Sequence, residues 1–162
     1  MLIRYARVFA AAVLLVSVIA CRTFADTGYS VSLNAAQEVP TNGSPAIGSG
    51  TLIVDIAETQ VTYNITYSGL TSNRTAQHIH GPAAVGVNAG VLVGLSGIGF
   101  TSGTISGIAP ITSLIAGYMA TMQTYVNIHT TNFPGGEIRG QVTPDATPAK
   151  LTTWGRLKKL YR

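Results

Sequence analysis

The chain has a single cysteine, Cys21, so no disulfide can form within it. Charged residues are also scarce, at 10% of the 162 residues, and no lysine occurs between residues 26 and 143. That segment contains two arginines and five acidic residues, although the whole chain has a formal net charge of +4. A mildly acidic domain lacks the clustered positive charge that binds phosphate backbones, which argues against recognition of nucleic acid.

The chain also lacks the motifs of common hydrolytic enzymes. It has no Gly-x-Ser-x-Gly elbow, since Ser96 lies in a poor match to that pattern, and it has no glycine-rich phosphate loop. It offers no catalytic pair of carboxylates, and its one cysteine lies in the N-terminal segment. We therefore expect a protein without enzymatic activity.

The N-terminal residues 1–25 have the features of a signal peptide. Two arginines precede a short apolar stretch, Val8–Ala20, which is too short to span a bilayer as a stable helix. The residues after this stretch are compatible with two processing sites: cleavage after Ala25, or a lipobox-like cleavage that would leave a lipid on Cys21. Both predict an exported protein that is secreted, periplasmic or attached to the cell envelope.

Composition and spacing predict an all-β domain over residues 26–143. Thr, Ser, Val and Ile are dispersed through it, and Gly, Pro and Asn interrupt them at close intervals, which favours short strands and turns. One short helix is expected at Ile111–Met119, with Thr112 as its cap. The strands should form an antiparallel β-sandwich or barrel. They are expected at residues 29–33, 50–56, 61–67, 77–80, 90–95, 98–106, 125–130 and 137–142.

The C-terminal part has a different pattern. Residues 144–150 are expected to be a linker, and residues 151–162 a short basic amphipathic helix. Three roles are open for this tail: packing against the domain or a neighbouring molecule, peripheral contact with an anionic membrane, or use as a sorting or export tag. Membrane contact would use Arg156, Lys158, Lys159 and Arg162.

The three histidines of the chain lie in strongly alternating segments. Strand alternation puts His78 and His80 on the face opposite Ile79. It likewise puts Asn127 and His129 on one face of a later strand. If these strands are neighbours, one face of the sheet gathers all three imidazoles.

Such a cluster suits two uses, apart from a merely solvated face. Imidazoles from an H-x-H strand and a neighbouring strand can bind copper or zinc with an open coordination position, provided that their nitrogens converge within about 4 Å. Alternatively, each histidine reaches a carbonyl or carboxylate, and a hydrogen-bonded structural network fixes the loops. That network would contain Asn127, Glu137, Arg139 and Gln141, with Arg139 bonding a carboxylate or loop carbonyls.

Four ordered motifs resemble the CHRD domain, which is named from chordin and is widespread in bacterial secreted proteins. They are Ala36–Pro40, His78–Ala83, Gly86–Gly90, and Tyr125–Thr130 together with Pro134–Gln141. The resemblance covers residues 27–143 and implies an extracellular, immunoglobulin-like β-sandwich, without a settled biochemical activity. The chain departs from the family at Met119–Thr124, which lengthens the approach from the small helix to the next strand.

The H-x-H motif also resembles the copper strand of Cu/Zn superoxide dismutases, although their further ligands and their disulfide are absent here. Our first hypothesis is a non-enzymatic exported module that serves structure, adhesion or recognition, with an unknown protein or envelope partner. The alternative is an extracytoplasmic copper- or zinc-binding protein that uses His78, His80 and His129.

Overall fold

The computed structural model describes residues 25–145. The expected signal peptide up to residue 24, Cys21 and the basic tail of residues 151–162 lie outside the described residues. Within the described part, no helix combines the length and apolarity needed to cross a membrane. The elements are β1 (Thr27–Asn34), η1 (Ala35–Gln37), β2 (Ile47–Val54), β3 (Gln60–Ser68), β4 (Arg74–His80), β5 (Val91–Gly94), β6 (Gly103–Pro110), α1 (Ser113–Ala120), β7 (Tyr125–Thr130) and β8 (Ile138–Pro144).

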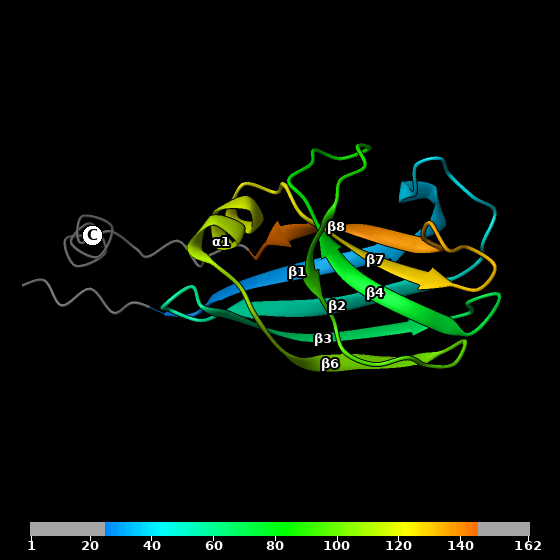
Figure 1. Cartoon of the computed structure of the whole chain (residues 1–162), viewed down its shortest axis with the longest axis horizontal. Coiled ribbons are helices and arrows are strands. Elements are labelled where there is room, and N and C mark those ends of the chain that lie inside the picture. Colours follow the sequence, from blue (N-terminus) through cyan, green and yellow to red (C-terminus); the bar gives the residue numbers. More distant parts are fainter. Residues whose placement is uncertain (1–24, 146–162) are drawn as a thin grey trace, which may run out of the picture.

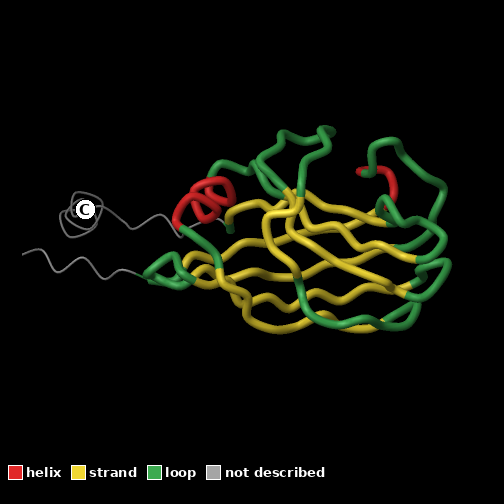
Figure 2. The backbone as a smooth tube through the Cα atoms, viewed as in Figure 1, coloured by secondary structure: helices red, strands yellow, loops and turns green. Residues whose placement is uncertain are grey.

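The eight strands form one antiparallel sheet in the order β5-β4-β7-β8-β1-β2-β3-β6 (Figure 1). The sheet curls until its two edges are bridged by the segment that joins β5 to β6. There the hydroxyl of Tyr63 accepts a hydrogen bond from the Ser96 N–H, and the hydroxyl of Tyr67 donates to the Phe100 carbonyl. The result is nearly a barrel, shown as a backbone trace in Figure 2.

The all-β, antiparallel class predicted from the sequence is confirmed. The immunoglobulin-like sandwich of two sheets is not confirmed, because strand pairing continues without a break from β5 to β6 among the described residues. Strand alternation looks the same in a sandwich and in a closing sheet, since both bury one face of every strand.

The alternation of buried and exposed residues along the strands determines which side chains form the core. Along β3 every second residue is buried, and the interior faces of β4, β7 and β8 carry fully buried Ile79, Val126, Ile128 and Ile138. Helix α1 lies across one end of the sheet, on the left in Figure 1, and buries Met119. As predicted, Thr112 caps this helix, because its side chain accepts a hydrogen bond from the Ile115 N–H.

One strand prediction was wrong in its position. The strand expected at 98–106 begins only at Gly103 and continues to Pro110. Before it, Gly97 adopts a left-handed φ of 87°, which ends extended pairing after β5, and only Gly99 forms a single bridge to Arg74. The preceding segment therefore forms the loop that bridges the two sheet edges.

Candidate functional site

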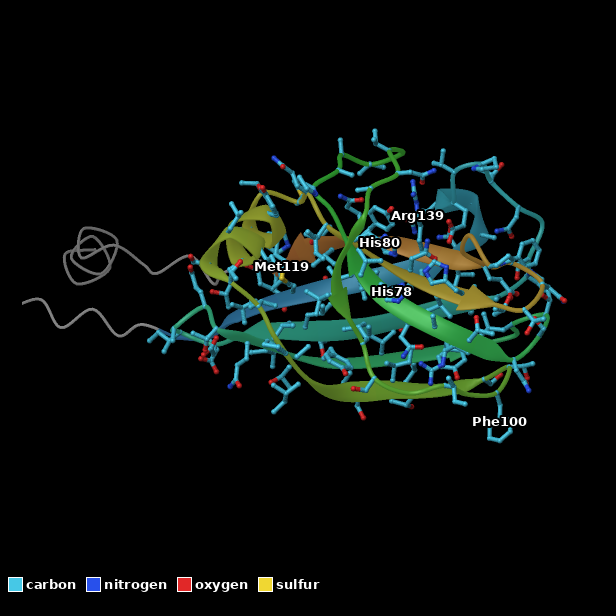
Figure 3. All side chains as sticks on the ribbon, viewed as in Figure 1. His78, His80, Phe100, Met119 and Arg139 are labelled. Carbon is cyan, nitrogen blue, oxygen red and sulfur yellow. The ribbon has the colours of Figure 1, made fainter. Side chains whose placement is uncertain are left out.

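The histidine strands are neighbours in the sheet. β4 pairs with β7, and β7 pairs with β8. In this register His78 lies opposite Asn127, and His80 lies opposite Tyr125. Because directly opposite residues share a face, the three imidazoles gather on the side of the sheet opposite the buried Ile79 and Ile128. Figure 3 labels two of them, His78 and His80.

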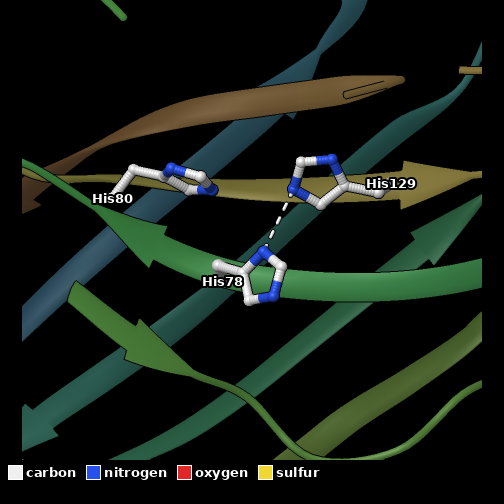
Figure 4. Close-up of side chains that lie close together, drawn as sticks. All are labelled: His78, His80 and His129. Atoms are coloured by element: carbon white, nitrogen blue, oxygen red, sulfur yellow. Dashed lines mark hydrogen bonds between the residues drawn. The ribbon is translucent and has the colours of Figure 1, made fainter. Parts of the chain in front are cut away.

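The structure brings the three imidazoles into one cluster (Figure 4). One nitrogen from each ring lies within 4.8 Å of the other two. His78 Nδ1 and His129 Nε2 lie 3.2 Å apart. The spread exceeds the convergence within about 4 Å that a metal site requires, so closure around a tetrahedral ion with bonds near 2.0–2.1 Å needs side-chain shifts of roughly 1 Å.

The outer nitrogens of two rings are fixed by loop carbonyls. His80 Nδ1 lies 3.0 Å from the Ala89 carbonyl, and His129 Nδ1 lies 3.0 Å from the Pro134 carbonyl. A carbonyl only accepts, so each Nδ1 carries the proton and each Nε2 keeps its lone pair. The His78 Nδ1–H then donates to His129 Nε2.

The inner nitrogen of His80 is unpaired. Its Nε2 is buried and has no hydrogen-bond partner among residues 25–145. Figure 4 shows it pointing toward the space beside His129. A buried lone pair without a donor is unfavourable, and binding of a cation would satisfy it. Anchoring of the second ring nitrogen by a carbonyl is the usual outer contact of a metal-binding histidine.

All three imidazoles are neutral at pH 7. The pKa of His129 is lowered to about 4, chiefly by burial and also by the neighbouring His78 and His80, against the Pro134 hydrogen bond. Burial also lowers the pKa of His78 and of His80. The cluster is therefore uncharged at neutral pH, and His80 Nε2 has a lone pair that no hydrogen bond uses.

Tyr125 supports His80 in two ways. Its ring stacks on the imidazole with centroids 5.0 Å apart and planes 8° apart. Its hydroxyl accepts from the Ala89 N–H at 3.0 Å and donates to the Ala89 carbonyl at 3.3 Å. Tyr125 thus holds both the imidazole and the carbonyl that orients it.

Arg139 joins η1 and one loop to β8. Its Nε donates to the Gln37 carbonyl, and one terminal nitrogen donates to Asn88 Oδ1 at 2.7 Å. Its guanidinium also lies 4.6 Å from the centroid of the Tyr125 ring. On the same strand, the Gln141 amide donates to two further loop carbonyls, those of Ala83 and Met122. Arg139 and Gln141 thus donate hydrogen bonds to four oxygen atoms that lie outside the strands.

Glu137 makes its contacts away from Arg139. It precedes the first residue of β8, and its fully buried carboxylate faces another group of loops. The carboxylate accepts from the Ser44 hydroxyl at 2.7 Å, the Thr71 N–H at 2.7 Å and the Thr130 hydroxyl at 2.6 Å. Among the described residues, these three are the hydrogen bonds of the Glu137 carboxylate. It does not pair with Arg139 of β8.

Sequence reasoning missed Glu38, the acid beside Asn127. Its side chain is 4% exposed, and Oε2 accepts from Asn127 Nδ2 at 3.4 Å. Glu38 Oε1 and Asn127 Oδ1 are buried without a partner in the described part of the chain. Burial raises the pKa of Glu38 to about 7, although Arg139 and Asn127 act in the opposite direction. Only its place in the Ala36–Pro40 motif singles it out in the sequence.

Comparison with known proteins identifies the domain that carries this site. A family model described as the CHRD domain matches residues 29–142. Neither the curated proteins nor the solved structures contain a match. The matched segment includes the three histidines and all of the network residues around them.

Proposed function

This chain belongs to the CHRD domain family, an extracellular type of module, and on that premise we propose that it is an exported, non-enzymatic protein that binds one copper or zinc ion. His78, His80 and His129 would be the ligands. The observation that supports this function is the unpaired, buried Nε2 of His80, which faces two further imidazole nitrogens whose rings are held by neighbouring residues.

The donor set suits a borderline transition-metal ion. Three neutral imidazoles, without a thiolate or carboxylate, are ligands that copper and zinc accept. The Irving–Williams order favours Cu(II) over Zn(II) at such a site. Binding would displace the proton from His78 Nδ1, and that imidazole would carry its proton on Nε2 instead. Three protein ligands leave one position of a tetrahedral ion open.

Calorimetric titration of the purified protein with Cu(II) and with Zn(II) tests this function. We expect one ion per chain, with a preference for Cu(II). Loss of a direct ligand in His80→Gln should weaken binding by more than the roughly 10–100-fold typical of changes around the ligands. Asn64→Ala, on the outer face of β3, is the control and should bind as the parent does. No heat with either ion, together with an unchanged melting curve, would remove the metal-binding function.

A second role, as a recognition or adhesion module, is favoured by a different surface. The strands β1, β2, β3 and β6 contain no charged residue, and their outer faces carry short hydroxyl and amide side chains such as Thr51 and Asn64. Ile47, Ile53 and Ile108 are exposed there. Replacing Thr51 and Asn64 with Lys should abolish adhesion of producing cells to a matrix while metal binding persists. Unaltered adhesion would exclude this surface from that role.

A further inference from the structure

A cleft of about 340 Å³ lies between the segment that follows η1 and the loop that joins β7 to β8. Residues 38–42 form one wall, and residues 132–136 form the other. Both segments lie at the end of the sheet away from α1 (Figure 1). The volume is near the lower limit of the roughly 300–1,000 Å³ typical of ligand pockets, so the cleft suits a small molecule or a single side chain.

Glu38, one of the residues that line this cleft, has a carboxyl group with almost no hydrogen bonds. The side chain is 4% exposed, and Oε1 has no partner in the described part of the chain. Oε2 accepts one long hydrogen bond, of 3.4 Å, from Asn127 Nδ2. A buried oxygen without a donor is unfavourable. The carboxyl therefore has room for a donor from outside residues 25–145.

Gly136, on the opposite wall, packs directly against this carboxyl. Its φ of 135° favours glycine, and a Cβ added there would lie 2.7 Å from Glu38 Oε1 and 2.6 Å from Asn127 Oδ1. Both of these oxygens are buried and without a donor. Any side chain at position 136 would cover them, so glycine keeps the two oxygens as close to the cleft as the backbone allows.

The described domain provides no cation that bonds to Glu38. Residues 25–145 contain no lysine. Arg139 donates its hydrogen bonds to the Gln37 carbonyl and to Asn88 Oδ1, and Arg74 donates to the Tyr67 hydroxyl. A buried carboxylate is stable only when it is paired or hydrogen-bonded. A cationic donor from another molecule would meet this need.

We propose that the cleft binds a primary ammonium group at the end of an apolar chain, with the Glu38 carboxylate as its counter-ion. An ammonium has three N–H donors, enough for Glu38 Oε1 and Asn127 Oδ1 together. The apolar part of the lining, which would contact the chain, consists of Val39, Pro40, Phe133 and Pro134. Two sources have this chemistry: a lysine side chain of another protein, and a small alkylammonium molecule. The inference is independent of metal binding, because it uses none of the histidines.

Titration of the full chain, without added metal, with n-butylammonium tests this site by nuclear magnetic resonance. The titration is run at pH 8.5, above the pKa of about 7 of Glu38, so that the carboxyl is ionised. We expect millimolar affinity, since so small a ligand makes few contacts. Shifts of backbone amide signals should be confined to residues 38–42 and 132–136. The neutral 1-butanol, which has the same length, should bind about tenfold more weakly, or worse.

Glu38→Gln keeps the shape of the side chain and removes its charge. We expect it to bind n-butylammonium about tenfold more weakly, or worse. Glu58→Gln, the same change at an exposed acid in the turn between β2 and β3, is the matched control and should bind as the parent does. Equal affinities in the parent and in Glu38→Gln, equal affinities for n-butylammonium and 1-butanol, or signal shifts elsewhere would overturn the inference.

A second probe separates the two sources of the ammonium group. Nα-acetyl-lysine methylamide has the same ammonium-bearing chain together with the backbone amides of a lysine in a protein. Tighter binding than n-butylammonium supports a lysine of a partner, and weaker binding supports a free alkylammonium. No shift of any signal with either probe would overturn the inference.

Discussion

Glu38→Gln tests the buried acid beside Asn127. The pKa of Glu38 is raised from 4.5 to about 7, chiefly by burial. In the unfolded chain the carboxyl ionises near its ordinary pKa, so the folded protein holds a proton between pH 4.5 and about 7 that the unfolded chain has lost. The contribution of this group to the free energy of unfolding therefore falls as pH rises through that window, and stays low above it.

The size of the effect depends on the pKa displacement. The change from 4.5 to about 7 corresponds to about 3 kcal/mol at most. Relaxation of the structure around the charge reduces this to about 1–2 kcal/mol. Glutamine has the shape of the protonated acid and is neutral at every pH. Glu38→Gln should therefore be more stable than the parent by about 1–2 kcal/mol at pH 8.5, and by about 0.4 kcal/mol or less at pH 4.5.

Urea denaturation followed by circular dichroism at the two pH values measures this difference. Glu58→Gln is the control, because Glu58 is an exposed acid in the turn between β2 and β3. This variant measures how much the loss of one exposed negative charge alone changes the free energy of unfolding. If Glu38→Gln were less stable than the parent at pH 8.5, the ionised carboxylate would be stabilised in the fold, and the argument from burial would be refuted.

Two further predictions concern the network and the histidines. Arg139→Ala should lower the free energy of unfolding by about 1–3 kcal/mol, because Asn88 and a loop carbonyl lose their donor; a change near zero in urea denaturation would contradict this. Bound copper or zinc should be retained at pH 6.5 and released as pH falls toward about 4, since the pKa of His129 is lowered to about 4, chiefly by burial, and protons compete with the ion for its lone pair there. A chromogenic chelator measures this release, and full retention at pH 3 would exclude histidine ligation.

Local pattern was enough to place the histidines. The β7 strand has the bounds predicted for it, Tyr125–Thr130, and β4 includes the whole of the expected H-x-H segment. A strand has a side-chain period of two, so the face of each imidazole can be inferred from the position of its aliphatic neighbours. A short hairpin connection made β7 and β8 neighbours, which left only the position of β4 to be supplied by the structure.

The partners of the polar residues could not be predicted in the same way. Glu38 meets Asn127 across 89 residues of sequence, and Arg139 meets Asn88 across 51. These contacts depend on how the loops fold over the sheet, and the conformation of a loop leaves no periodic pattern in the sequence. The closing of the sheet was also hidden, because a two-sheet sandwich and a continuous sheet demand the same alternation of buried and exposed residues.

The pairing of β1 with β8 has a consequence for how the domain can be attached to anything else. Tyr29 lies opposite Pro144, and the Asp145 N–H bonds the Gly28 carbonyl, so the chain enters and leaves the domain at one point. In Figure 1 this point is at the end with α1, away from η1. A tether or fusion at either terminus would hold the domain by that end alone. The loops at the far end, including the one that anchors His129, would then project outward into the surroundings.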